Sequence, residues 1–122
     1  QDPTNAELRT LLALAYERRG LAENRIAPKS EETKTYFERR HRILRGLLEE
    51  EPTNYLWQQE YIMSCCRLKK VGAGDRDTTM ACKHDIPRLM SNLQQQTTNG
   101  TIDGHLERLR SDSCVQEAMM SN

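Results

Sequence analysis

The chain carries two adjacent cysteines, Cys65 and Cys66, in a segment whose apolar spacing is otherwise typical of a helix. Adjacent residues of a helix point about 100° apart. One partner therefore cannot serve both sulfur atoms, and a single metal ion is difficult to bind with both. The other cysteines are Cys82 and Cys114. We expect two disulfides that join this helix to two later segments, with the pairing left open because four cysteines allow three connectivities.

Two other states of the cysteines compete with the disulfides. Four buried free thiols would suit a cytosolic protein, because cysteine packs as a small hydrophobic residue. A zinc site could use Cys82 and His84 together with Cys114 and one of the adjacent pair, but the C-x₂-C spacing of structural zinc sites is absent. The disulfides are favoured over both alternatives, so no bound metal is expected. Each disulfide would stabilise the fold by about 2–4 kcal/mol.

The pattern of the whole chain predicts a single all-α domain spanning residues 1–122. A length of 122 residues suits one domain, and helix-forming residues are common while β-branched residues are few. Apolar residues at helical spacing predict five helices, arranged as a compact bundle or a helical-hairpin array with antiparallel neighbours. No uncharged apolar run approaches the roughly 18 residues that a membrane span requires.

The expected boundaries follow from capping residues and glycines. The first helix is expected to begin at Thr4 and to end at Gly20. Residues 71–82, which contain two glycines and no apolar period, are expected to form a loop, and residues 83–122 the C-terminal helices. The predicted core face of the first helix consists of Leu8, Leu11, Leu12, Ala15 and Tyr16.

The N-terminal part of the chain, residues 1–70, resembles tetratricopeptide (TPR) repeats, which are helical hairpins. In the first helix the resemblance rests on Pro3, Asn5, Leu12, Ala13, Tyr16 and Gly20. A second "PTN" at Pro52–Asn54 resembles the start of a further repeat, with residues 23–35 as an insertion. The resemblance implies stacked hairpins that offer a groove between helices to a peptide or protein partner.

Nothing in the sequence indicates catalysis. His41, His84 and His105 stand in no catalytic or metal-binding motif, and no phosphate-binding glycine loop is present. Cys82 and His84 are two residues apart, a spacing that rarely lets a nucleophile and a base face each other. We therefore expect a protein that is not an enzyme and uses no cofactor.

One basic cluster provides candidate partner-binding residues. It consists of Arg39, Arg40, Arg42 and Arg45. The cluster suits a solvated helix face first and an acidic protein partner second, and the same arginines could supply hot spots in a protein interface, where arginine is enriched. The 18 basic and 18 acidic residues balance, and aromatic residues do not interleave with the arginines, so nucleic acid is disfavoured as a partner.

A glycosylation motif bears on the compartment. Asn99 begins "NGT", an acceptor for N-linked glycans, in a predicted loop. Together with the expected disulfides, this motif favours a secreted, luminal or extracellular location. The sequence thus predicts a non-catalytic helical module that binds a protein partner, such as a receptor or a ligand. The alternative is a cytosolic TPR-type adaptor that binds a peptide.

Overall fold

The structure is a computed structural model that describes residues 3–98 and 104–120, and these ranges form six helices and no strand. The predicted all-α class is therefore confirmed. The expected last helix is divided at Asp112, whose side chain accepts a hydrogen bond from the Cys114 backbone N–H at 2.8 Å and so starts a new helix. The helices are α1 (Pro3–Ile26), α2 (Glu31–Glu50), α3 (Tyr55–Val71), α4 (Arg76–Thr98), α5 (Gly104–Ser111) and α6 (Ser113–Met120).

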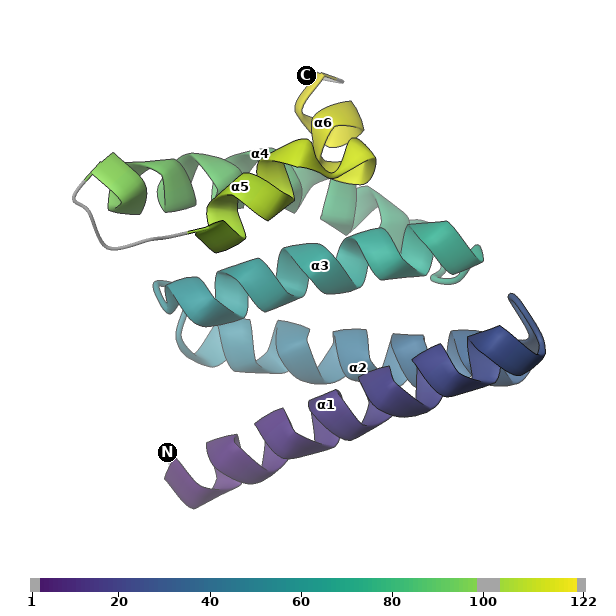
Figure 1. Ribbon diagram of the computed structural model, residues 1–122. Coiled ribbons are helices and arrows are strands. Elements are labelled where there is room, and N and C mark those ends of the chain that lie inside the picture. Colours follow the sequence, from purple (N-terminus) through teal and green to yellow (C-terminus); the bar gives the residue numbers. More distant parts are fainter. Residues whose placement is uncertain (1–2, 99–103, 121–122) are drawn as a thin grey trace.

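Helix α3 lies in the middle of the molecule. The first three helices are stacked as antiparallel neighbours, and α4, α5 and α6 cover the opposite side of α3 (Figure 1). A principal core joins both sides, and its larger members are Leu44, Leu47, Leu48, Trp57, Tyr61, Ile62, Ile86, Leu89, Met90, Leu93, Leu106, Leu109 and Val115. Because α3 contacts helices on both sides, side chains on it can link the two halves of the chain.

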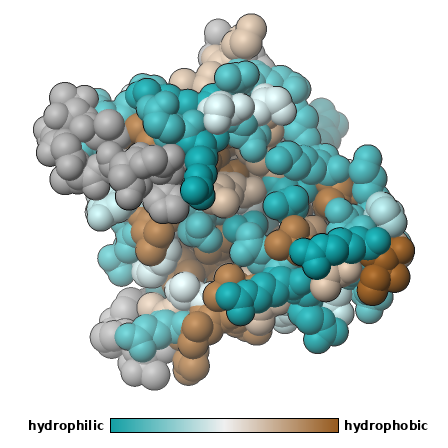
Figure 2. Space-filling view, in the orientation of Figure 1, coloured by the Kyte–Doolittle hydropathy of each residue, from teal (hydrophilic) through white to brown (hydrophobic). Residues whose placement is uncertain are grey.

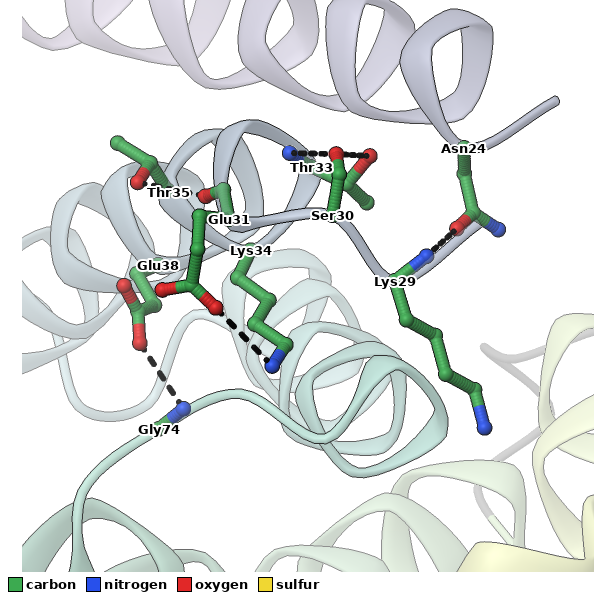
Figure 3. Close-up of polar contacts among 9 residues, drawn as sticks. All are labelled: Asn24, Lys29, Ser30, Glu31, Thr33, Lys34, Thr35, Glu38 and Gly74. Atoms are coloured by element: carbon green, nitrogen blue, oxygen red, sulfur yellow. Dashed lines mark hydrogen bonds and ion pairs between the residues drawn. The ribbon is translucent and has the colours of Figure 1, made fainter. Parts of the chain in front are cut away.

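The turn between α1 and α2 is fixed by local polar contacts (Figure 3). Lys29 adopts a left-handed backbone conformation with φ 57°, and its N–H donates a hydrogen bond to the Asn24 side chain at 2.8 Å. Ser30 then caps the first turn of α2 with its hydroxyl. Further along α2, Glu38 accepts a hydrogen bond at 3.0 Å from the backbone N–H of Gly74, which ties α2 to the turn that follows α3.

The turn between α3 and α4 is shorter than the predicted loop of residues 71–82. Gly72 ends α3 in the left-handed conformation, with φ 71°. The Asp75 side chain accepts a hydrogen bond from the Thr78 backbone N–H at 2.8 Å, and α4 begins at the next residue after Asp75. The predicted loop is wrong because these polar residues form a helix cap and a first turn. Cys82 therefore lies inside α4.

Helix α1 packs on α2 through small residues that are seven positions apart, namely Ala6, Ala13 and Gly20. The prediction that the helix ends at Gly20 is wrong, since α1 continues to Ile26. A Cβ atom on Gly20 would lie 2.7 Å from a ring carbon of Phe37 in α2. The glycine thus permits a close approach of the two helices rather than a stop.

The predicted core face of α1 is wrong for its leucines. Leu8, Leu11 and Leu12 are 60%, 61% and 46% exposed, and Ala15 is exposed too. Helix α1 is the outermost of the stacked helices, so the rest of the chain covers the face toward α2 and leaves the leucines uncovered (Figure 1). Apolar side chains are visible among hydrophilic ones in the part of the surface that α1 forms (Figure 2).

We predict that Gly20→Ala destabilises the protein by about 1–3 kcal/mol, because the added methyl group must displace the packed ring of Phe37. Gly46→Ala in α2 is the matched control, since a Cβ there would meet only the terminal nitrogen of the long Arg9 side chain, at 2.9 Å, rather than a buried ring. Alanine has the higher helix propensity, so the control should be neutral or stabilise by up to about 1 kcal/mol. Urea-induced unfolding measures both changes, and equal effects would contradict the close packing at Gly20.

Candidate protein-binding surface

The adjacent cysteines of α3 form disulfides with two different helices. Cys65 is bonded to Cys82 in α4, and Cys66 to Cys114 in α6. The Cα–Cα distances are 5.8 and 5.7 Å, which are ordinary for disulfides, and no cysteine is free. The two expected disulfides are therefore present, and the structure selects one of the three connectivities that the sequence left open.

The zinc site that the sequence left as a disfavoured alternative does not assemble. The His84 side chain is 77% exposed and contacts Asp85 rather than the sulfur atoms. The histidine beside the first disulfide is instead His41 of α2, which has a ring nitrogen within 4.8 Å of the sulfur atoms of Cys65 and Cys82. Sulfur atoms joined in a disulfide offer no thiolate to a metal ion, so this group packs as part of the core.

A chain of buried polar contacts links α2, α3 and α4. The Nδ1 atom of His41 lies 2.7 Å from the Ser64 hydroxyl, which donates a hydrogen bond to the Tyr61 carbonyl oxygen at 2.7 Å. The Tyr61 hydroxyl in turn donates to Asp85 at 2.7 Å. Because the Ser64 hydroxyl donates its proton to the Tyr61 carbonyl, its oxygen can only accept from His41, so the Nδ1–H of His41 is the donor in that hydrogen bond. These contacts give the side chains of His41, Ser64 and Tyr61 hydrogen-bond partners inside the helix interface.

The same contacts shift the pKa values of the groups involved. Burial lowers the pKa of His41 to about 4, with the charges of Arg45 and Arg40 adding to the effect and Asp85 opposing it. Burial and the hydrogen bond to Asp85 raise the pKa of Tyr61. His41 is therefore neutral at pH 7. Because Ser64 and His41 are both buried, the pair stabilises the contact of α2 with α3 and does not present a nucleophile to solvent.

The four candidate arginines do not form one surface cluster. Arg40 is only 2% exposed, and its guanidinium lies between Glu17 of α1 and Glu60 of α3, at 3.5 and 3.6 Å. It is a link between three helices, so its prediction as a partner-binding residue is wrong. Arg39, Arg42 and Arg45 are exposed. Of these, Arg39 lies over the Tyr16 ring, 5.8 Å from its centroid, and so extends the surface of α1.

The exposed leucines of α1 form an apolar surface that the sequence did not predict. Leu8, Leu11 and Leu12 share one face of the helix, since they are three and four residues apart. Scattered exposed leucines are ordinary on a protein surface, but aligned ones mark interaction sites. We call this set, with Ala15, the α1 outer face. The apolar spacing indicated this stripe, but whether another helix covers it depends on the tertiary arrangement.

A separate cleft of about 440 Å³ lies between α3, α4 and α6. Its lining includes cysteines of both disulfides, and Leu68, Ile86 and Ala118 supply further apolar surface. The ion pair of Lys69 with Glu117 joins α3 to α6 beside it. No residue of α1 lines the cleft, so it belongs to the disulfide-bonded half of the molecule and is distinct from the α1 outer face.

No protein-family model, curated protein or solved structure matches the chain. The resemblance of residues 1–70 to TPR repeats therefore stays a prediction. The candidate glycosylation residue Asn99 lies outside the described residues. In the part of the chain that the structure describes, no helix is sufficiently long and apolar to cross a bilayer.

We predict that the two disulfides contribute unequally to stability. Replacing Cys66 and Cys114 by serine should cost about 4 kcal/mol, and replacing Cys65 and Cys82 about 3 kcal/mol, because the first pair closes the longer loop. The sequence separations are 48 and 17 residues. The free energies of unfolding in urea, compared between the two double variants, provide the measurement. A reversed order would show that loop closure does not govern the difference.

We also predict that stability falls as the pH decreases from about 6.5 to about 4. The pKa of His41 is 6.5 in the unfolded chain and about 4 in the folded chain. The unfolded state therefore binds more protons in this window, at a cost of about 2–3 kcal/mol. His41→Gln should flatten this part of the pH profile, whereas the matched variant His84→Gln should keep it. Identical profiles for the two variants would contradict the assignment.

Proposed function

We propose that the chain is a non-catalytic helical domain that binds a protein partner through the α1 outer face. This proposal rests on the exposure of Leu8, Leu11 and Leu12 on one side of a well-formed helix. Exposed apolar surface of this kind costs solvation free energy that a partner recovers on binding. Small residues of α1 and Leu21 pack toward α2, whereas Leu8, Leu11 and Leu12 are exposed, so these three leucines remain available without any rearrangement.

Neighbouring side chains suit the rim of a protein interface. Tyr16 is partly buried between α1 and α2, its ring lies 6.4 Å from that of Tyr36, and Arg39 lies over it. Tyrosine and arginine are enriched among the residues that dominate binding energy. Their contacts with one another limit their motion before binding, which lowers the entropy lost when a partner docks. This supports Arg39 as a partner-binding residue.

We further propose that the domain acts as a secreted, luminal or ectodomain module, with a receptor or ligand as its partner. The two disulfides support this location, because they persist in oxidising compartments and are rare in the cytosol. The "NGT" sequence at Asn99 adds a candidate glycosylation site.

A TPR-type adaptor is the second candidate. The stacked antiparallel arrangement of α1, α2 and α3 favours it (Figure 1), since TPR arrays consist of helical hairpins in contact with their neighbours. In that case the partner would be a peptide bound between helices, and the cysteines would be reduced in the cytosol. Intact mass with and without a reductant separates the two candidates, because only the secreted module would gain four hydrogen atoms when the reductant converts its two disulfides to four thiols.

We predict that Leu11→Glu weakens partner binding by at least about tenfold, as expected for the loss of an apolar anchor. The measurement is the binding of fluorescently labelled domain to a panel of cell surfaces by flow cytometry. Met80→Glu is the matched control, because Met80 on α4 is 60% exposed and Leu11 is 61% exposed. Both variants should retain the helical circular dichroism of the parent, since exposed positions contribute little to stability. Equal binding by the two variants would exclude the α1 outer face.

A further inference from the structure

The outward residues of α1 follow a spacing that suits docking of another helix. Leu8, Leu11, Ala15, Arg18 and Ala22 are separated alternately by three and four residues, and Arg25 continues the series. All six are exposed. An alternation of three and four gives a mean repeat of 3.5 residues, which is the repeat that brings two helices together along a shared seam. The first half of this seam is leucine-rich, and the second half alternates alanine with arginine.

The arginines of α1 fall into two groups that differ in their partners. Arg9 forms an ion pair with Glu50 at 2.6 Å, and Arg19 donates a hydrogen bond to the Tyr36 hydroxyl at 2.9 Å. Within residues 3–98 and 104–120, no ion pair is recorded for the two seam arginines, Arg18 and Arg25. The arginines that face α2 are thus used by the fold, while those on the seam are available to a partner.

We infer that the α1 seam takes an amphipathic helix of a partner protein, with apolar side chains against Leu8 and Leu11 and carboxylates against Arg18 and Arg25. This inference rests on the proposed function and specifies its partner. Ala15 and Ala22 are short, so they let a second helix approach closely beside Arg18 and Arg25. Because the two arginines are seven residues apart, the partner's carboxylates share that spacing, which fixes the register of the pair.

A second copy of the chain fits this seam less well than a different protein. Among the described residues of α1, Glu7 is the only exposed acidic side chain, since Glu17 and Glu23 are both partly buried. Glu17 also pairs with Arg40. An antiparallel copy would therefore bring one carboxylate toward two seam arginines. The positive charge of Arg18 and Arg25 favours a partner helix that carries at least two carboxylates.

The test uses a synthetic amphipathic helical peptide with leucines at the seam positions and two glutamates seven residues apart, and a matched peptide with lysines in place of the glutamates. Fluorescence anisotropy of the labelled peptides on the folded, oxidised protein gives the affinities. The glutamate peptide should bind more tightly, on the order of tenfold, because two ion pairs at a partly desolvated interface are gained. The doubly substituted Arg18→Glu and Arg25→Glu protein should reverse the preference.

A control variant, Arg76→Glu with Arg108→Glu, makes the same change in net charge on α4 and α5, where both arginines are exposed. It should keep the preference for the glutamate peptide. Reversal by the control as well, or equal binding of the two peptides, would overturn the inference. A dimer in sedimentation velocity that dissociates on the Arg18→Glu and Arg25→Glu change would also overturn it, in favour of self-association.

The peptide experiment and the Leu11→Glu experiment can fail independently, so the inference and the proposed function are tested separately. If neither peptide binds but Leu11→Glu still loses cell-surface binding, the charged-helix partner is excluded and the α1 outer face stands. If Leu11→Glu changes neither the binding of the glutamate peptide nor the binding to cell surfaces, both the inference and the proposed surface are excluded.

Discussion

The structure depends on helix α3, which is joined by disulfides to two different helices. Adjacent cysteines on α3 diverge around the helix axis, so each reaches a different neighbour, Cys82 in α4 and Cys114 in α6. The C-terminal helices are short or, in α4, contain a proline, and covalent links to α3 offset their small packing surfaces. Without these links, α6 would rely on a single turn or two of apolar contact.

The N-terminal half is held by different means. Small residues of α1 let α2 approach closely, and the buried guanidinium of Arg40 lies between carboxylates of α1 and α3. A buried charge of this kind adds little net stability compared with apolar packing, but removing Arg40 would leave both carboxylates without their cation, at high cost. We therefore regard Glu17, Arg40 and Glu60 as residues that fix how the three helices stack. This division leaves the leucines of α1 facing solvent.

Much of this fold could be predicted from the sequence, and the failures have physical reasons. Helical spacing and the divergence of Cys65 and Cys66 predicted the class and the disulfides. The pairing could not be predicted, because it depends on which neighbour each sulfur faces. The leucines of α1 recur at helical spacing, but the side that packs on α2 is formed by small residues, and only the tertiary arrangement decides which side is covered. For the same reason the sequence cannot separate Arg40 from its exposed neighbours, although a residue one position along a helix points in a different direction.

The order of the cysteines along the chain has a consequence for biosynthesis. Cys65 and Cys66 both emerge before either partner, and Cys82 emerges well ahead of Cys114. In a chain that is oxidised while it is being made, both early thiols therefore compete for the first partner to arrive. Once α3 has formed, it turns Cys65 toward α4 and Cys66 away from it, which favours the native Cys65–Cys82 disulfide. Helix formation would then decide which disulfide forms first, and an isomerase would be needed to correct the pairing where the helix forms late.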